Sequence, residues 1–129
     1  MKIAFTTKTG ETIDMHFGQA DSFQIWEVGP EEAHYLETVT VGAHGSDEED
    51  RISARTSLLA DCAVVYTMQI GGPAAAKLIA KRIHPMKTNV EVGLKESIER
   101  MQEVLRGNPP PWLRKAMNKG QAGSFMDED

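Results

Sequence analysis

The sequence contains few of the residue types on which specialised proteins depend. It has one cysteine, so the chain alone forms neither an internal disulfide nor a four-thiolate metal site. No apolar run approaches the roughly 18 residues of a membrane span, and the N-terminus lacks the charged-then-apolar pattern of a signal peptide. The formal net charge of −5 argues against binding nucleic acid by phosphate neutralisation. We therefore expect a cytoplasmic protein that contacts neither nucleic acid nor membrane.

Sequence patterns of common catalytic sites are also missing. The chain has no serine-centred nucleophile elbow, no His-Glu-x-x-His pair and no Cys-x-x-Cys pair. A metal-dependent nuclease on a mixed sheet would need acidic residues on its first strand, and residues 2–6 contain none. We therefore do not expect an enzyme.

The most informative stretch of the chain covers residues 62–83. It begins with an unbroken apolar run, which is typical of a strand covered on both faces and so of a parallel sheet. Gly71 and Gly72 predict a tight turn with positive φ, and Pro73 suits the first helical position because its missing N–H would be unbonded there. Free N–H groups at such a helix start attract anions. The stretch therefore indicates a strand, a glycine turn and a helix.

Three short strands are expected before this unit. Their apolar or alternating patterns cover residues 2–6, 23–28 and 35–41. Short links between them favour an antiparallel meander.

Helices and one more strand account for most of the remaining chain. Ser46 and Glu49 match a capping box, which predicts a helix over about residues 46–60. Residues 87–92 are the candidate for the last strand. Apolar residues recur at helical spacing over residues 94–105, which predicts an amphipathic helix.

The end of the chain shows clear stop signals. Gly107 suits the cap that ends the preceding helix, and the prolines at 109–111 prevent its continuation. Residues 112–117 could dock a short helix. We expect one domain over residues 1–117 and an acidic, disordered tail over residues 118–129. The order β-β-β-α-β-α-β-α fits an α/β fold with one mixed five-stranded sheet and helices packed on it.

Residues with binding chemistry converge if the first and central strands are parallel neighbours. The loop after the first strand carries His16, and it would then leave the sheet at the same edge as Gly71 and Gly72. We expect an imidazole donor beside anion-binding amides at that edge. Met68 lies near the same end of the central strand and could offer a thioether, although core packing is the simpler explanation for it.

Structural explanations stay open for each of these residues. A lone loop histidine is often inconsequential, and many βα units have a glycine turn. Cys62 begins the buried strand at the opposite edge, where a small core residue is expected, and His84 lies at that far edge in a turn with Pro85. Asp14 and Asp21 flank the loop histidine, so a carboxylate could orient its imidazole or simply be solvated.

Four motifs together are similar to those of the dinitrogenase iron–molybdenum cofactor biosynthesis family. They are His16-Phe17-Gly18 followed by Phe23, residues 70–77, Ile83-His84-Pro85, and residues 108–113. The likeness covers about residues 1 to 117, and the length resembles that of single-domain family members. The first two motifs together are specific for this family, whereas either motif alone is not.

The resemblance implies a ribonuclease H-like sheet and a non-enzymatic role. Such proteins bind iron–molybdenum cofactor or its iron–sulfur precursor as transient cargo and pass it between assembly proteins. The implied partners are NifB and the NifEN scaffold, with apo-dinitrogenase as a further recipient, and we expect a monomer. The loop histidine of the family, its expected metal ligand, corresponds to His16. The other cofactor-binding residues that we expect are Phe17, Gly18, Met68, Gly71 and Gly72.

Two other functions stay open besides the carrier. The chain could regulate or scaffold the nitrogenase assembly machinery through the region of Trp112 without holding the cofactor, or act on a phosphorylated metabolite at the glycine turn. A carrier fits the residues because these clusters are anionic and one histidine at an open edge gives an exchangeable attachment. Imidazole must be neutral to ligate, so binding is expected to weaken as pH falls through the histidine range.

Overall fold

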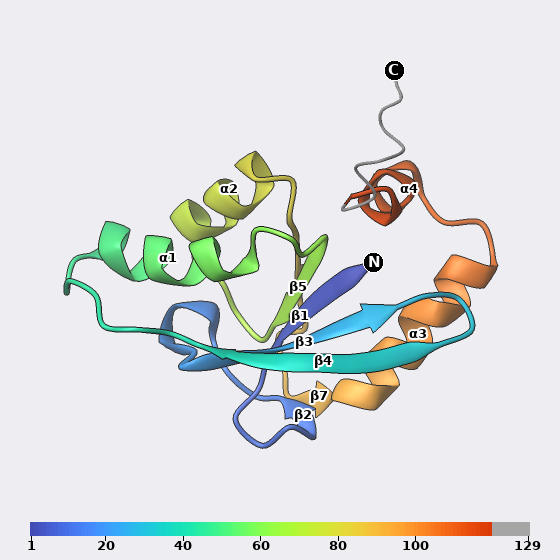
Figure 1. Cartoon of the computed structure of the whole chain (residues 1–129), viewed down its shortest axis with the longest axis horizontal. Helices are drawn as coiled ribbons and strands as arrows, with labels where there is room; N and C mark the ends of the chain where they lie inside the picture. Colours follow the sequence, from blue (N-terminus) through green and yellow to red (C-terminus); the bar gives the residue numbers. More distant parts are fainter. Residues whose placement is uncertain (120–129) are drawn as a thin grey trace.

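The computed structural model describes residues 1–119, and most of the expected tail lies outside the described residues. Its main feature is a five-stranded mixed sheet in the order β4-β3-β1-β5-β6 (Figure 1). β1 pairs antiparallel with β3, and β3 pairs antiparallel with β4, as the expected meander requires. β1 also pairs parallel with β5, and β5 with β6. The strands are β1 Lys2–Thr6, β3 Ser22–Val28, β4 Ala33–Thr40, β5 Val64–Thr67 and β6 His84–Lys87.

Burial along the strands follows their position in the sheet. All four residues of β5 are buried, which confirms that its unbroken apolar run is covered on both faces. β4 is an edge strand and most of its residues are exposed, including Tyr35 and Leu36. The alternating pattern that predicted β4 therefore reflects a strand at the rim of the sheet.

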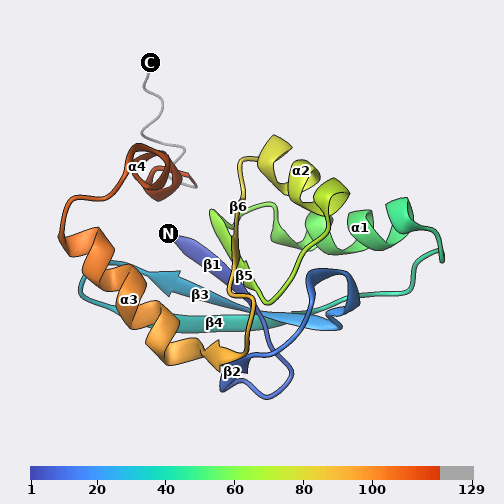
Figure 2. The same cartoon turned by 180° about the vertical axis from the view of Figure 1, so that it is seen from behind.

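Helices cover the two faces of the sheet unequally. α1 (Glu48–Thr56) and α2 (Gly72–Ala80) lie on one face, while α3 (Leu94–Arg106) lies on the other and α4 (Pro111–Met117) sits beyond its end (Figures 1 and 2). Two separate core clusters result. One joins Ile3 and Phe5 to α3, and the other, which contains Ala4, packs against α2.

The predicted helix around residues 46–60 is present, but α1 covers only Glu48–Thr56 and its N-cap lies one residue after Ser46. Its N-cap is Asp47, whose carboxylate accepts a hydrogen bond from the Asp50 backbone N at 2.8 Å. The Ser46 capping box is therefore wrong. After Thr56 the chain tightens into a short 3-10 helix, Ser57–Leu59.

The last strand of the sheet differs most from its prediction. β6 covers His84–Lys87 in place of residues 87–92, and His84 lies in the strand and not in a turn. The cause is parallel pairing, because β5 offers a free edge where Val64 aligns with His84. A second, two-stranded sheet was missed altogether: β2 (Thr12–Ile13) pairs with β7 (Val92–Gly93). Each of these strands has two residues, which are too few to show the alternating pattern by which a strand is recognised in a sequence.

The C-terminal helices agree with the sequence prediction. The apolar stripe of α3 is buried at Leu94, Ile98, Met101 and Leu105. Gly107 is its C-cap, and α4 begins at a proline. Within the described residues, no helix is long and apolar enough to cross a bilayer.

Candidate functional site

The loop that carries His16 and the turn before α2 lie side by side at one edge of the sheet. The Phe17 backbone N donates to Gln69 O at 2.9 Å, and Met68 N donates to Met15 O at 3.1 Å. These two bonds join the chain after β2 to the chain after β5. The predicted convergence at the carboxyl edge of β1 and β5 is therefore confirmed.

Buried anchors hold the His16 loop in place. The hydroxyls of Thr6 and Thr67 both donate to Met15 O, at 3.0 and 3.1 Å. The Phe17 ring is fully buried and packs against Phe23 with ring centroids 5.6 Å apart. Because Phe17 points inward, its neighbour His16 is left exposed. The structure thus places Phe17 as a positioning residue whose ring has no access to solvent.

Beside the exposed imidazole lies a hollow of about 420 Å³ lined by His16, Gly18, Gln19 and Arg51. Arg51 comes from the first turn of α1, where one guanidinium N donates to Ser46 O at 3.4 Å. Sequence reasoning missed this arginine. No local motif marks it, and it reaches the loop only because α1 packs over the short 3-10 helix Phe17–Gln19.

The glycines at 71 and 72 differ from the expected turn. Gly71 is the N-cap of α2 with φ −77° and ψ 159°, and Gly72 is the first helical residue, so the predicted positive φ is wrong. A Cβ at Gly72 or at Gly18 would meet nothing within 4 Å. The fold itself therefore does not require glycine there. These glycines leave the backbone around them uncovered by side chains. The N-cap of α2 also makes no side-chain hydrogen bond, so the first amides of the helix stay available to a ligand.

Met68 contributes to the edge through its backbone. Its side chain packs against the α3-side cluster, whereas the Phe17 ring belongs to the cluster on the opposite face. The hollow beside His16 is not lined by Met68 or by the α2 glycines. The structure therefore brings these residues to one edge without bringing all of their atoms into one cavity.

Two further candidate ligands lie away from this edge, as their sequence positions predicted. Cys62 is buried, and burial raises the pKa of its thiol to about 12. His84 aligns with Val64 at the start of the parallel strands and stacks on Trp112, with ring centroids 3.8 Å apart. Partial burial lowers the pKa of its imidazole.

Asp14, one of the two aspartates that could have oriented His16, binds its own loop instead. The Asp14 carboxylate accepts bonds from Lys8 N at 2.9 Å and from the Thr9 hydroxyl at 3.2 Å, which shapes the loop after β1. Among residues 1–119, no three His, Cys, Asp or Glu side chains are grouped so that they could hold a metal ion. A metal-containing ligand at this edge would therefore not find His16 within a group of three such side chains.

The fold and this edge define a class: a small mixed α/β domain with an exposed histidine loop beside a helix start. The profile of the family described as "Dinitrogenase iron-molybdenum cofactor" matches residues 1–104. The chain is 36% identical over 123 residues to NifX of Herbaspirillum seropedicae, covering 94% of this chain and 84% of that protein. The chain belongs to the dinitrogenase iron–molybdenum cofactor family.

Other similarities agree with this membership. The chain is 39% identical to NifY of Azotobacter vinelandii over 117 residues, which are 91% of this chain but 48% of that longer relative. The crystal structure of PH0822 shares the fold, with a TM-score of 0.65 at 18% identity, over 80% of this chain and 89% of the other.

Proposed function

We propose that this protein carries iron–molybdenum cofactor, or its iron–sulfur precursor, between the proteins that assemble the nitrogenase cofactor. The observation on which this depends is the exposed His16 imidazole, held by buried anchors at the carboxyl edge of the sheet. Because the imidazole is exposed, it can bind a cluster that is too large to fit into the hollow beside it. The fold supplies a rigid base, and the ligand stays accessible.

Charge at the edge supports an anionic cargo. Iron–sulfur clusters bound by thiolates or sulfides carry negative charge, and Arg51 presents a guanidinium to the hollow beside His16. The amides at the start of α2 add partial positive charge nearby, and Gly72 leaves them uncovered. These features favour anion binding without committing the site to one cluster form.

A single protein ligand suits a carrier that must release its cargo. Several thiolates hold an iron–sulfur cluster tightly, whereas one imidazole exchanges more readily. Cys62 cannot assist, because it is buried at the far edge. We infer that the protein has no catalytic residues and that its role is non-enzymatic transfer.

A relationship to NifB supports our proposal for the source of the cargo. Part of the "FeMo cofactor biosynthesis protein NifB" of Bradyrhizobium diazoefficiens is 30% identical to this chain over 126 residues, which are 85% of this chain and 25% of NifB. We propose NifB and the NifEN scaffold as partners, with apo-dinitrogenase as a further recipient. The alternative is a regulatory or scaffolding role in the same assembly without cluster binding.

Anaerobic titration tests the carrier directly. Isolated precursor cluster or iron–molybdenum cofactor is added to the protein, and uptake is read from visible absorption and from iron that co-elutes in gel filtration. We expect His16→Ala to lose most of the uptake, while His34→Ala, which removes an exposed histidine from β4, retains it. Arg51→Gln should weaken uptake roughly tenfold, by loss of a charge-assisted bond.

Two results of this titration, and one of a separate activity assay, would contradict the carrier. No uptake by the wild-type protein would favour the scaffolding role. Equal uptake by His16→Ala and wild type would show that another group ligates the cluster. Turnover of phosphate esters by the metal-free protein would instead favour an enzyme at the α2 start.

A further inference from the structure

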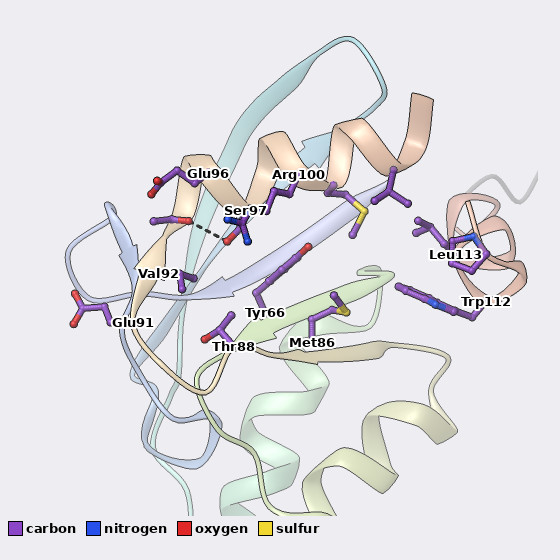
Figure 3. Close-up of a pocket in the computed structure, with 14 residues that line it drawn as sticks. Tyr66, Met86, Thr88, Glu91, Val92, Glu96, Ser97, Arg100, Trp112 and Leu113 are labelled. Carbon is purple, nitrogen blue, oxygen red and sulfur yellow. Dashed lines mark hydrogen bonds between the residues drawn. The ribbon is translucent and has the colours of Figure 1, made fainter. Parts of the chain in front are cut away.

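A second cavity lies on the opposite face of the sheet from His16. It has a volume of about 820 Å³ and is bounded by β5 and β6 below, α3 along one side and α4 at one end (Figure 3). Cavities of roughly 300 to 1,000 Å³ are typical of sites for small organic molecules. The proposed transport function makes no use of this cavity.

The floor of the cavity holds a tyrosine whose hydroxyl has no hydrogen-bond partner among the described residues. Tyr66 is 7% exposed and its ring stacks on Phe5, with centroids 5.1 Å apart. Its hydroxyl makes no hydrogen bond to any described residue, and Figure 3 shows the ring rising from β5 into the cavity. Burial raises the pKa of Tyr66 to about 12, so the phenol stays protonated and can donate. The ring is buried while the hydroxyl opens into the cavity, where it can donate to an acceptor on a ligand.

Both signs of charge gather at one end of the cavity. Arg100 projects from α3, and Glu96 precedes it by one helical turn, while Glu91 lies on the loop before β7. The Glu91 carboxylate is already held by the Thr12 hydroxyl at 2.7 Å. Within residues 1–119, no salt bridge joins Arg100 to either glutamate. The guanidinium therefore has donors available for a ligand.

The other end of the cavity is apolar. Trp112 and Leu113 of α4 close it (Figure 3), and Met86 of β6 and Met101 of α3 also line the cavity. Methionine and tryptophan side chains adapt to apolar ligands of varied shape. A ligand that fills this cavity would place an apolar body here and a polar head at the charged end.

We propose that this cavity binds a small zwitterion of the apolar α-amino acid class. Its carboxylate would bind Arg100 and the Tyr66 hydroxyl, its ammonium group would face Glu96, and its side chain would lie against Met86 and Trp112. A simple carboxylic acid would meet the glutamates unfavourably, and a simple amine would leave the arginine and the phenol unpaired. A head with both charges complements the exposed arginine and glutamate at once.

Three probes of one shape test the head group. Phenylalanine carries both charges, 3-phenylpropionate lacks the ammonium and phenethylamine lacks the carboxylate. In Trp26→Phe, Trp112 is the single tryptophan and its fluorescence reports on the cavity; calorimetry on the wild-type chain provides an independent measurement. The pH is held constant and mildly basic, because Trp112 stacks on the titratable His84. We expect saturable phenylalanine binding that is about tenfold tighter than that of either analogue.

Matched variants on α3 test the residues. We expect phenylalanine binding to weaken about tenfold in Arg100→Gln and in Glu96→Gln. The controls are Lys95→Gln and Glu99→Gln, which make the same charge changes outside the cavity and should leave binding unchanged. Tyr66→Phe keeps the ring stacked on Phe5 and should also weaken binding, with an unchanged circular dichroism spectrum.

Two results would overturn the proposal. One is the absence of saturable phenylalanine binding by the wild-type chain. The other is binding in which either single-charge analogue equals phenylalanine, or in which Arg100→Gln behaves like Lys95→Gln. Neither result bears on the uptake of cluster at His16.

Discussion

Cys62 shows how one residue's surroundings decide its chemistry. The thiol is buried at the start of β5, and its pKa of about 12 leaves almost no thiolate at neutral pH. We predict that 5,5′-dithiobis(2-nitrobenzoate) labels the native protein slowly at mildly basic pH and rapidly once urea unfolds it. The protein contains a single cysteine, so the signal is unambiguous. Fast labelling of the folded chain would show that the thiol is accessible.

His84 makes folding stability depend on pH. Burial lowers its pKa below that of a free histidine, so between these two pKa values the unfolded chain binds a proton that the folded chain does not. The free energy of unfolding therefore rises with pH across that window and falls as the solution becomes acidic. We predict that His84→Phe, which keeps an aromatic ring against Trp112, flattens this dependence in urea unfolding between about pH 5 and 8.

The control for this measurement is His34→Ala, because His34 is exposed on β4. It should keep the pH dependence of the wild type. If both variants show the same slope as the wild type, burial does not lower the pKa of His84 enough to make stability depend on pH.

At the scale of the element, one substitution at the start of α2 should change folding stability and cluster binding in opposite directions. Gly72 has an ordinary helical conformation and open space where a Cβ would lie. Gly72→Ala should therefore fold normally and gain about 0.5 to 1 kcal/mol in free energy of unfolding, because alanine loses less chain entropy. Its methyl group would cover the helix amides, so we predict weaker cluster uptake.

Gly42→Ala is the matched control for α2. A Cβ at Gly42 also meets nothing within 4 Å, but this glycine lies in the loop before α1. It should leave cluster uptake unchanged. Undiminished uptake by Gly72→Ala would mean that the open amides of α2 do not bind the cargo. A loss of stability would mean that the fold requires glycine at position 72.

At the scale of the whole molecule, the sheet separates two layers, and each layer carries one of the two proposed binding sites. His16 lies on the layer with α1 and α2, and the second cavity lies beneath α3. No described side chain lines both spaces, so we predict that they act independently. Arg100→Gln should leave cluster uptake unchanged, and His16→Ala should leave phenylalanine binding unchanged. A change in either affinity on binding the other ligand would reveal coupling between the faces.

Long patterns in the sequence predicted their elements well. The apolar run of β5, the proline at the start of α2 and the α3 stripe each depend on neighbours within one element. The misses depend on partners elsewhere in the chain. β6 is placed by pairing with β5, and the β2–β7 ladder joins segments that carry no signal of their own. Asp47 replaced Ser46 as the cap because both residues suit that position and local propensity does not choose between them.

The sequence by itself determined the α/β class and the elements with long patterns, because burial on both faces leaves an unbroken apolar run. It placed His16 and the α2 start at one edge only on the supposition that β1 and β5 are parallel neighbours, and the tertiary structure decided that pairing. Only the tertiary structure decided that Arg51 joins His16 and that Met68 turns to the other face. It alone also revealed the cavity under α3. Such contacts depend on how separate elements pack, and packing brings together residues that share no local pattern.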